Sequence, residues 1–171
     1  SLTIADLSTE AFPFMRSKRM TVAGVDVIAL RVSFTGDLGW ELHCAEADQL
    51  RLYEALLEAA KQLGAGPVGS RALMSLRVEK GYGSWSREYS PEYWPQEVGL
   101  DRLVKTEKEF LHKDEYLAVK DNAPREVLSL IHVTDIDGAD ATGGEPIFLP
   151  DGTPVGRVTS GTYGYAVDMS L

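Results

Sequence analysis

Cysteines and long apolar runs are scarce in this chain. Its 171 residues include one cysteine, Cys44, so no internal disulfide can form. We expect Cys44 to be a reduced, half-buried core residue in the cytoplasm, or in the mitochondrial matrix of a eukaryote. No apolar stretch approaches the roughly 20 residues that a membrane helix needs. The first residues also lack the basic and apolar regions of a signal peptide. These absences argue against a disulfide-bonded or membrane-spanning protein.

The sequence also lacks a net positive charge and several common catalytic patterns. A net charge of -9 argues against binding to nucleic acid or to an anionic membrane, although a local basic pocket can still hold an anion. The three histidines have no metal-type neighbours, and neither GxSxG nor a Cys/His constellation occurs. A dinucleotide fingerprint GxGxxG is absent as well. A hydrolase, a metalloenzyme and a flavin-binding domain are therefore poor interpretations of this chain.

The first 121 residues mix strand and helix patterns. Hydrophobic residues make up 44% of the chain and charged residues 25%, which is typical of a globular protein. Residues 20–34 read as a hairpin broken at Ala23-Gly24, and after a turn the strand pattern resumes at residues 40–44. Three- and four-residue spacing predicts a helix over 46–63 that ends at Gly64. We expect this helix to bury four side chains: Leu50, Tyr53, Leu57 and Leu63.

Four further elements are expected in this part of the chain. Ser70 can cap a second helix, and the aromatic and proline residues of 81–98 indicate an ordered loop. Residues 99–105 are compatible with a strand and 112–120 with a short helix. The predicted fold class for this region is therefore α+β.

Beyond Asp121 the pattern changes to short strands separated by Gly, Asp and Pro. Asp151-Gly152 is a strong hairpin signal. The expected strands cover 127–133, 146–149, 155–159 and 163–167. We therefore predict two domains, 1–121 and 122–171, and expect both to be incomplete parts of a longer protein.

The segment from Arg31 to Leu42, RVSFTGDLGWEL, carries the densest chemical signal. Glu41 lies between Trp40 and Leu42 on a strand, so its side chain points to the opposite face from theirs. A carboxylate in this position can accept two parallel N–H groups from a planar aminopyrimidine such as a pterin, with Phe34 as an aromatic wall. The alternative is an ordinary solvated strand residue.

Two other motifs allow either a functional or a structural interpretation. In SLRVEKGY, Arg77 and Lys80 can reach one anion, or they can pair with Glu79 or Glu88 at a helix end closed by Gly81. The glycines of GTPVGRVTSGTYG suggest a phosphate loop, but no helix pattern follows them. Two strands and their turns explain this segment better.

These three segments, in this order and at this spacing, resemble the glycine cleavage T-protein (aminomethyltransferase) superfamily. RVSFTGDLGWEL is similar to the family's strand-turn-strand, and SLRVEKGYGSW resembles its SLRLEKG segment as found in dimethylglycine and sarcosine dehydrogenases. GTPVGRVTSGTYGY resembles the signature of its C-terminal β domain. The resemblance covers roughly residues 5–171. It implies part of a folate-binding domain followed by a small β-barrel or jelly-roll-like domain.

The resemblance also implies the residues that bind tetrahydrofolate. The family's pterin-binding glutamate falls on Glu41, and the aromatic residue that packs at the folate falls on Phe34, without the usual tyrosine hydroxyl. A second aromatic falls on Trp85. The family's arginine on the helix of the second motif aligns with Leu73, so Arg71, two residues earlier, is the candidate here. The catalytic aspartate and the flavin domain of the dehydrogenases lie upstream of the matched motifs.

The function implied by the resemblance is transfer of a one-carbon unit from a small methylated amine or amino acid to tetrahydrofolate. FAD is expected only in a missing upstream domain, and the fragment is expected to be inactive alone. Three alternatives stay open: a tetrahydrofolate-dependent demethylase of the same fold, a non-catalytic folate-binding or assembly module, and an unrelated β-rich interaction domain that uses the aromatic loop 82–94. The upstream sequence would distinguish the first two from a dehydrogenase.

Overall fold

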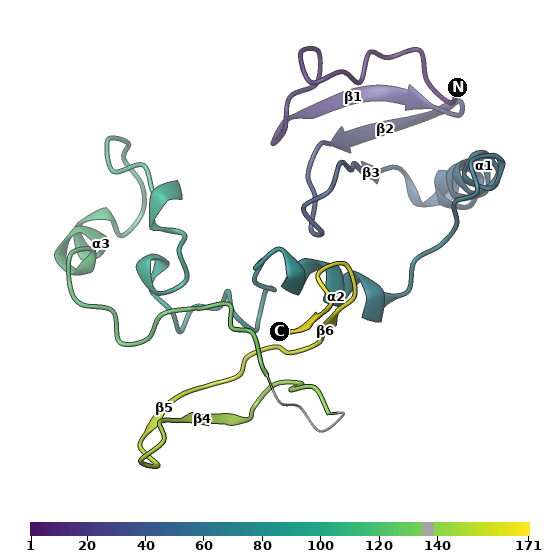
Figure 1. The fold of residues 1–171 in the computed structure, drawn as a ribbon. Helices are drawn as coiled ribbons and strands as arrows, with labels where there is room; N and C mark the ends of the chain where they lie inside the picture. The colour runs from purple at the N-terminus through teal and green to yellow at the C-terminus, as the bar shows by residue number, and fades with distance from the viewer. Residues whose placement is uncertain (135–138) are drawn as a thin grey trace. The chain divides into compact units, whose positions relative to one another are not determined.

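The computed structural model describes residues 1–134 and 139–171 (Figure 1). The chain divides into two compact units, residues 1–74 and residues 75–171. Each unit mixes helical segments with strands, as the predicted α+β class requires. The boundary expected near residue 122 separates two folding domains, which are not the same as these compact units. That boundary therefore stays a prediction.

The first unit is built on an antiparallel sheet in the order β1-β2-β3. Ala23 and Gly24 join β1 to β2 with φ angles of 51° and 76°, the left-handed conformation that such a tight turn requires. The predicted hairpin is therefore confirmed, although it is displaced toward the N-terminus. The strands are β1 (Ser17–Val22), β2 (Val25–Leu30) and β3 (Glu41–His43).

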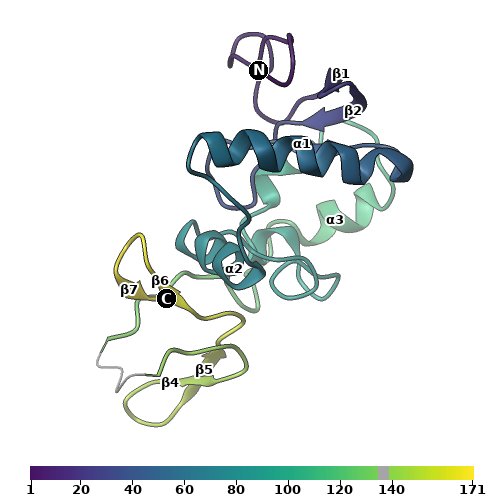
Figure 2. The same ribbon diagram turned by 90° about the vertical axis from the view of Figure 1, so that its right-hand side faces the viewer.

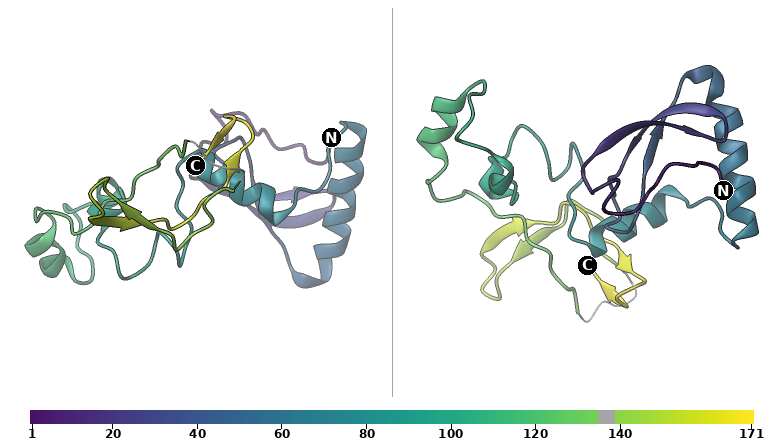
Figure 3. Two further views of the ribbon diagram at one scale, coloured as in Figure 1. Left: turned by 60° about the horizontal axis from the view of Figure 1, so that its bottom comes forward. Right: turned by 90° about the horizontal axis from the view of Figure 1, so that it is seen from above.

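Alternation along β2 supplies half of the buried residues in the first unit's core. Val25, Val27 and Ala29 are buried, whereas the residues between them face outward. Phe12, Val22 and Leu52 complete the cluster, and Cys44 packs against it half-buried and free, as expected. Figure 3 (right) shows the hairpin and α1 of this unit from above.

The predicted first helix is present, but the prediction of its buried face was wrong. A 3-10 turn, η1 (Glu46–Asp48), leads into α1 (Gln49–Gln62), and Leu63 and Gly64 follow its end. Leu52 is the buried side chain of α1, at 4% exposure, whereas Leu50 is 67% and Leu63 86% exposed. Tyr53 is also exposed and Leu57 only half-buried. A single helix on a three-stranded sheet can bury one narrow stripe, and here that stripe centres on Leu52.

Helical turns and a long loop form the N-terminal part of the second unit. The predicted short helix is confirmed, whereas the strand expected over 99–105 is wrong because a 3-10 turn lies there. Residues 82–94 form the irregular loop that the aromatic composition indicated. The helical elements after α1 are α2 (Ser70–Glu79), which begins in the first unit, η2 (Pro95–Glu97), η3 (Asp101–Leu103) and α3 (Lys113–Val119).

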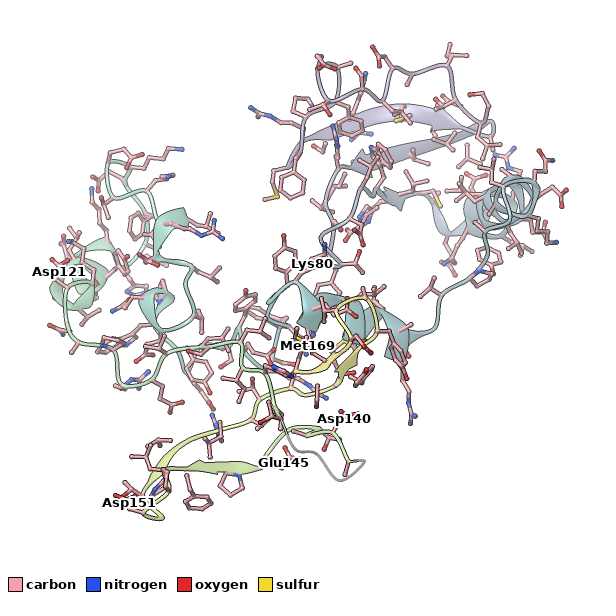
Figure 4. All side chains as sticks on the ribbon, viewed as in Figure 1. Lys80, Asp121, Asp140, Glu145, Asp151 and Met169 are labelled. Carbon is pink, nitrogen blue, oxygen red and sulfur yellow. The ribbon has the colours of Figure 1, made fainter. Side chains whose placement is uncertain are left out.

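The C-terminal part of the second unit contains two antiparallel ribbons, β4-β5 and β6-β7 (Figure 2). The Asp151-Gly152 turn joins β4 to β5 as predicted, and Gly152 has a φ of 86°. Figure 4 labels Asp151 at this turn and Glu145 just before β4. The strands are β4 (Pro146–Phe148), β5 (Pro154–Arg157), β6 (Tyr163–Gly164) and β7 (Met169–Ser170).

Two of the predicted C-terminal strands are corrected by the structure. Residues 127–132 form no strand, and only Val133 makes an isolated bridge, to Ser170. The strand expected over 163–167 ends at Gly164, because the chain then turns back through Asp168 (φ 56°) into β7. Apolar composition alone does not supply a hydrogen-bonding partner, and within residues 1–134 and 139–171 no ladder includes residues 127–132. In the described part of the chain, no helix has the length and apolar content to cross a membrane.

Candidate functional site

Glu41 begins β3 on the face of the strand that points away from the core. Backbone pairing sets Glu41 opposite Leu30 of β2, while Trp40, Leu42 and Cys44 pack against the core cluster. The predicted alternation is thus confirmed. The carboxylate is 59% exposed, and its Oε2 lies 3.5 Å from Nε2 of His43, on the same face. An exposed carboxylate held by a strand can accept paired N–H donors from a ligand.

Phe34 lies in the loop that leads to Glu41 and not in a strand as predicted, because β2 ends at Leu30. Gly36 has a φ of 76°, which lets this loop reverse tightly. Arg31 ties the start of the loop to the N-terminal segment, because its guanidinium donates to the Phe12 carbonyl at 2.6 Å and lies 5.9 Å from the Trp40 ring centre. The Phe34 side chain is 37% exposed. A partly exposed aromatic therefore comes from the same loop as the carboxylate.

Arg71 lies in the first turn of α2, with its side chain exposed. The structure thus leaves its guanidinium accessible to an anion, and its assignment to the folate site stays a prediction.

Trp85 belongs to the second unit and is 76% exposed. It lies in a loop that closes on itself, because the amides of Glu88 and Tyr89 both donate to the Ser84 carbonyl, each at 3.1 Å. The Gly83 amide also donates to the Tyr89 hydroxyl at 3.2 Å. Since each unit is described by itself, the proximity of Trp85 to Glu41 stays a prediction.

A buried ion pair supports the base of this loop. Arg77 on α2 and Glu88 are each 3% exposed, and Nη1 of Arg77 lies 3.3 Å from Oε2 of Glu88. Of the two possibilities left open for Arg77, pairing with Glu88 is confirmed. Ser160 bridges the same pair: its Oγ accepts from Nη2 of Arg77 at 2.5 Å and donates to Oε1 of Glu88 at 2.6 Å.

The electrostatics of Glu88 favour its charged form. Burial acts to raise the pKa of Glu88, but the hydrogen bonds from Ser160, the Ser84 amide and Thr159, together with the charge of Arg77, hold that pKa below its usual range. The carboxylate is therefore ionised and paired at neutral pH. Sequence reasoning considered Glu88 as a partner of Arg77 but missed Ser160.

Two glycines of the C-terminal motif, Gly161 and Gly164, serve close packing. A Cβ on Gly161 would lie 2.3 Å from the Ala141 carbonyl oxygen, and one on Gly164 would lie within 3.0 Å of Val167 and Glu79 atoms. The segment folds as β5, a connecting turn and β6, which confirms the interpretation as strands and turns. These glycines are therefore explained without a phosphate ligand.

A second clamp, around Glu97, had no sequence signal. Arg125 donates from Nε to Oε1 of Glu97 at 2.8 Å and from Nη2 to Oε2 at 2.7 Å, and its guanidinium lies 5.0 Å from the Trp94 ring centre. The hydrogen bonds from Arg125, with a further one from the Trp94 amide, lower the pKa of Glu97 to about 2 although burial opposes the shift. This clamp fixes the end of the aromatic loop to residues 125–128.

Comparison with known proteins identifies relatives across almost the whole chain. The family model described as the GCVT N-terminal domain matches residues 1–108. The mitochondrial dimethylglycine dehydrogenase of Mus musculus is 37% identical over 172 residues, which cover 99% of this chain and 20% of that protein. The mitochondrial sarcosine dehydrogenase of Homo sapiens is 35% identical over 167 residues, 98% of this chain and 18% of that protein. The chain thus spans about a fifth of the length of these curated relatives.

A solved structure shares the fold. The crystal structure of the glycine cleavage system aminomethyltransferase T from Bartonella henselae matches with a TM-score of 0.77 at 23% identity, over 95% of this chain and 44% of that one. The mixed α/β fold of this chain therefore also occurs in a solved protein structure.

Proposed function

Because the chain belongs to the GCVT N-terminal domain family, we propose that it supplies part of the tetrahydrofolate site of a longer enzyme. In this proposal the enzyme takes a one-carbon unit from a small methylated amine or amino acid, such as dimethylglycine or sarcosine, and passes it to tetrahydrofolate. The names of the relatives, mitochondrial dimethylglycine dehydrogenase and sarcosine dehydrogenase, support this choice of substrate class. Both names also contain the word mitochondrial, which supports a mitochondrial location in a eukaryote; we propose the matrix there, and the cytoplasm otherwise.

The observation that carries the proposal is the placement of Glu41. Its carboxylate is exposed on the outer face of β3, next to a loop that contains Phe34, while the other face of the strand packs on the core. An ionised carboxylate only accepts hydrogen bonds, and a pterin edge offers an amino group and a ring N–H side by side. The donor and acceptor sets are therefore complementary.

The remaining site residues have distinct proposed roles. Phe34 and Trp85 provide apolar surfaces for the folate, and Arg71 is a candidate for its anionic part. When bound, tetrahydrofolate supplies the nitrogen that takes up the one-carbon unit. The residues of this chain bind and orient it and exclude water, which accelerates transfer through positioning. None of them is proposed to act as the catalytic acid or base.

The proposed enzyme needs parts beyond the four site residues of this chain. The catalytic aspartate and, in a dehydrogenase, the FAD-binding domain would lie in upstream sequence. The C-terminal ribbons would belong to a small β-barrel or jelly-roll-like domain that begins near residue 122. We therefore expect no turnover from the 171-residue chain alone.

The test uses the protein encoded by the complete gene. Purified protein is supplied with sarcosine or dimethylglycine, with and without tetrahydrofolate, and both methylenetetrahydrofolate and free formaldehyde are quantified. The proposal predicts that tetrahydrofolate diverts the carbon from formaldehyde into methylenetetrahydrofolate. Formaldehyde release that is unchanged by saturating tetrahydrofolate would contradict it.

A further inference from the structure

The loop that presents Trp85 is fastened to two distant parts of the second unit by one buried carboxylate. Oε2 of Glu88 accepts the Ser84 amide at 2.8 Å and lies 3.3 Å from Nη1 of Arg77. Oε1 of the same carboxylate accepts the Ser160 hydroxyl at 2.6 Å. Helix α2, the aromatic loop and the segment after β5 therefore meet at Glu88.

Glu88 acts directly on the residue that precedes Trp85. The Ser84 amide is held by Oε2, and the Ser84 carbonyl receives the amides of Glu88 and Tyr89. Ser86, on the other side of Trp85, has a φ of 67° and donates its amide to the Tyr89 carbonyl at 2.9 Å. Both backbone neighbours of Trp85 are thus restrained, while the indole itself is 76% exposed.

The pairing is unusual for a surface loop because the charges at its base are almost fully buried. Arg77 and Glu88 are each 3% exposed, whereas many charged pairs of this chain lie in solvent. Burying two charges carries a desolvation cost that a well-packed apolar pair would avoid. A buried pair at this point does, however, define one conformation for the loop above it, because each oxygen of Glu88 has a directional partner.

We infer that Glu88, held by Arg77 and Ser160, is a positioning residue that fixes the 82–89 loop so that Trp85 is presented in one orientation to the aromatic part of a folate. The inference rests on the proposed function for the identity of the ligand. Glu88 does not contact the ligand in this account, and it acts only through Trp85. If the loop sampled several orientations, only the molecules with Trp85 in the binding orientation could bind folate. The apparent affinity would then fall in proportion to the fraction of such molecules.

The experiment is a double-mutant cycle in the full-length protein, with tetrahydrofolate affinity measured by calorimetry. The variants are Glu88→Gln, Trp85→Ala and the two together, and Glu92→Gln, an exposed carboxylate of the same segment, is the matched control. We expect Glu88→Gln to weaken binding about fivefold, as for a loop that is competent a fifth of the time. We expect the same substitution to have no further effect once Trp85→Ala is present, because the two act as one unit. Glu92→Gln should bind like the wild type.

A purely structural role for Glu88 would give a different pattern. Losses from Glu88→Gln and Trp85→Ala that add in the double variant would overturn the inference, as would wild-type affinity in either single variant. If Glu88→Gln fails to fold by thermal melt, Ser160→Ala replaces it in the same cycle, since it removes one bridge and leaves the ion pair. The expected loss is then about twofold, again absent in the Trp85→Ala background.

The two proposals fail in distinguishable ways. A wild-type protein that does not bind tetrahydrofolate overturns the proposed function and the inference together. A wild-type protein that binds, with additive variants, overturns only the positioning role of Glu88.

Discussion

Gly161→Ala should destabilise the second unit strongly, because no space exists for the added methyl group. The new Cβ would lie 2.3 Å from the Ala141 carbonyl oxygen and 2.6 Å from its carbon. Both obstacles are backbone atoms, so one segment must move as a whole. Overpacking of this kind costs about 1–3 kcal/mol, and we expect the upper end here because no side chain can rotate away. For a chain of this length the loss corresponds to a fall of roughly 6–12 °C in Tm.

Gly156→Ala is the matched control, five residues earlier in the same glycine-rich segment. A Cβ at Gly156, within β5, would meet nothing within 4 Å. Thermal unfolding of the chain, followed by circular dichroism, should therefore show a Tm close to that of the wild type for this variant. Equal melting temperatures for the two alanine variants would refute the close-packing explanation of Gly161.

Two further perturbations test the clamp around Glu97 and the core of the first unit. The pKa of Glu97 falls from 4.5 to about 2 through its bonds to Arg125, so the stability that it contributes is present above pH 4.5 and is lost as the pH falls toward 2. Acid titration followed by fluorescence should show this loss of stability between pH 4.5 and 2, and Glu97→Gln should flatten that part of the stability curve. A wild-type stability curve that is already flat between these pH values would contradict the ion pair as the cause of the lowered pKa. Leu52→Ala should cost about 2–4 kcal/mol in urea unfolding, and Leu50→Ala less than about 1 kcal/mol, because only Leu52 is buried. Equal costs would show that the buried face of α1 is misplaced.

Local patterns predicted two features of the first unit, the hairpin turn and the outward face of Glu41. Gly24 marked the hairpin turn because glycine adopts the left-handed conformation without a steric cost, and the alternation of Trp40, Glu41 and Leu42 placed the carboxylate on the outer face. The motif order likewise led to the family. Each of these signals comes from residues that are close in the sequence, and those residues alone determine the local structure.

Features that depend on distant partners could not be predicted. The hydroxyl of Ser160 bonds to Arg77, 83 residues earlier in the chain, and no spacing rule connects the two. Glu97 and Arg125 form their clamp across 28 residues in the same way. Residues 127–132 have strand composition, but they pair with no strand in the part of the chain that the structure describes. Helix α1 offers several apolar stripes, and Leu52 is its buried residue.

Calorimetric titration of the full-length protein with tetrahydrofolate, for the wild type and Glu41→Gln, tests the central claim most directly. The swap turns one acceptor into a donor that faces the pterin's own donors. It disturbs the fold little, because among the described residues the one ion pair of Glu41 is with the exposed His43 side chain, at 3.5 Å. Hydrogen bonds to a charged partner contribute about 1.5–3 kcal/mol, so affinity should fall about tenfold or more. Glu54→Gln, on the exposed face of α1, should bind like the wild type. Equal affinities for the wild type and Glu41→Gln, with unchanged thermal melts, would remove Glu41 from the site and contradict the account.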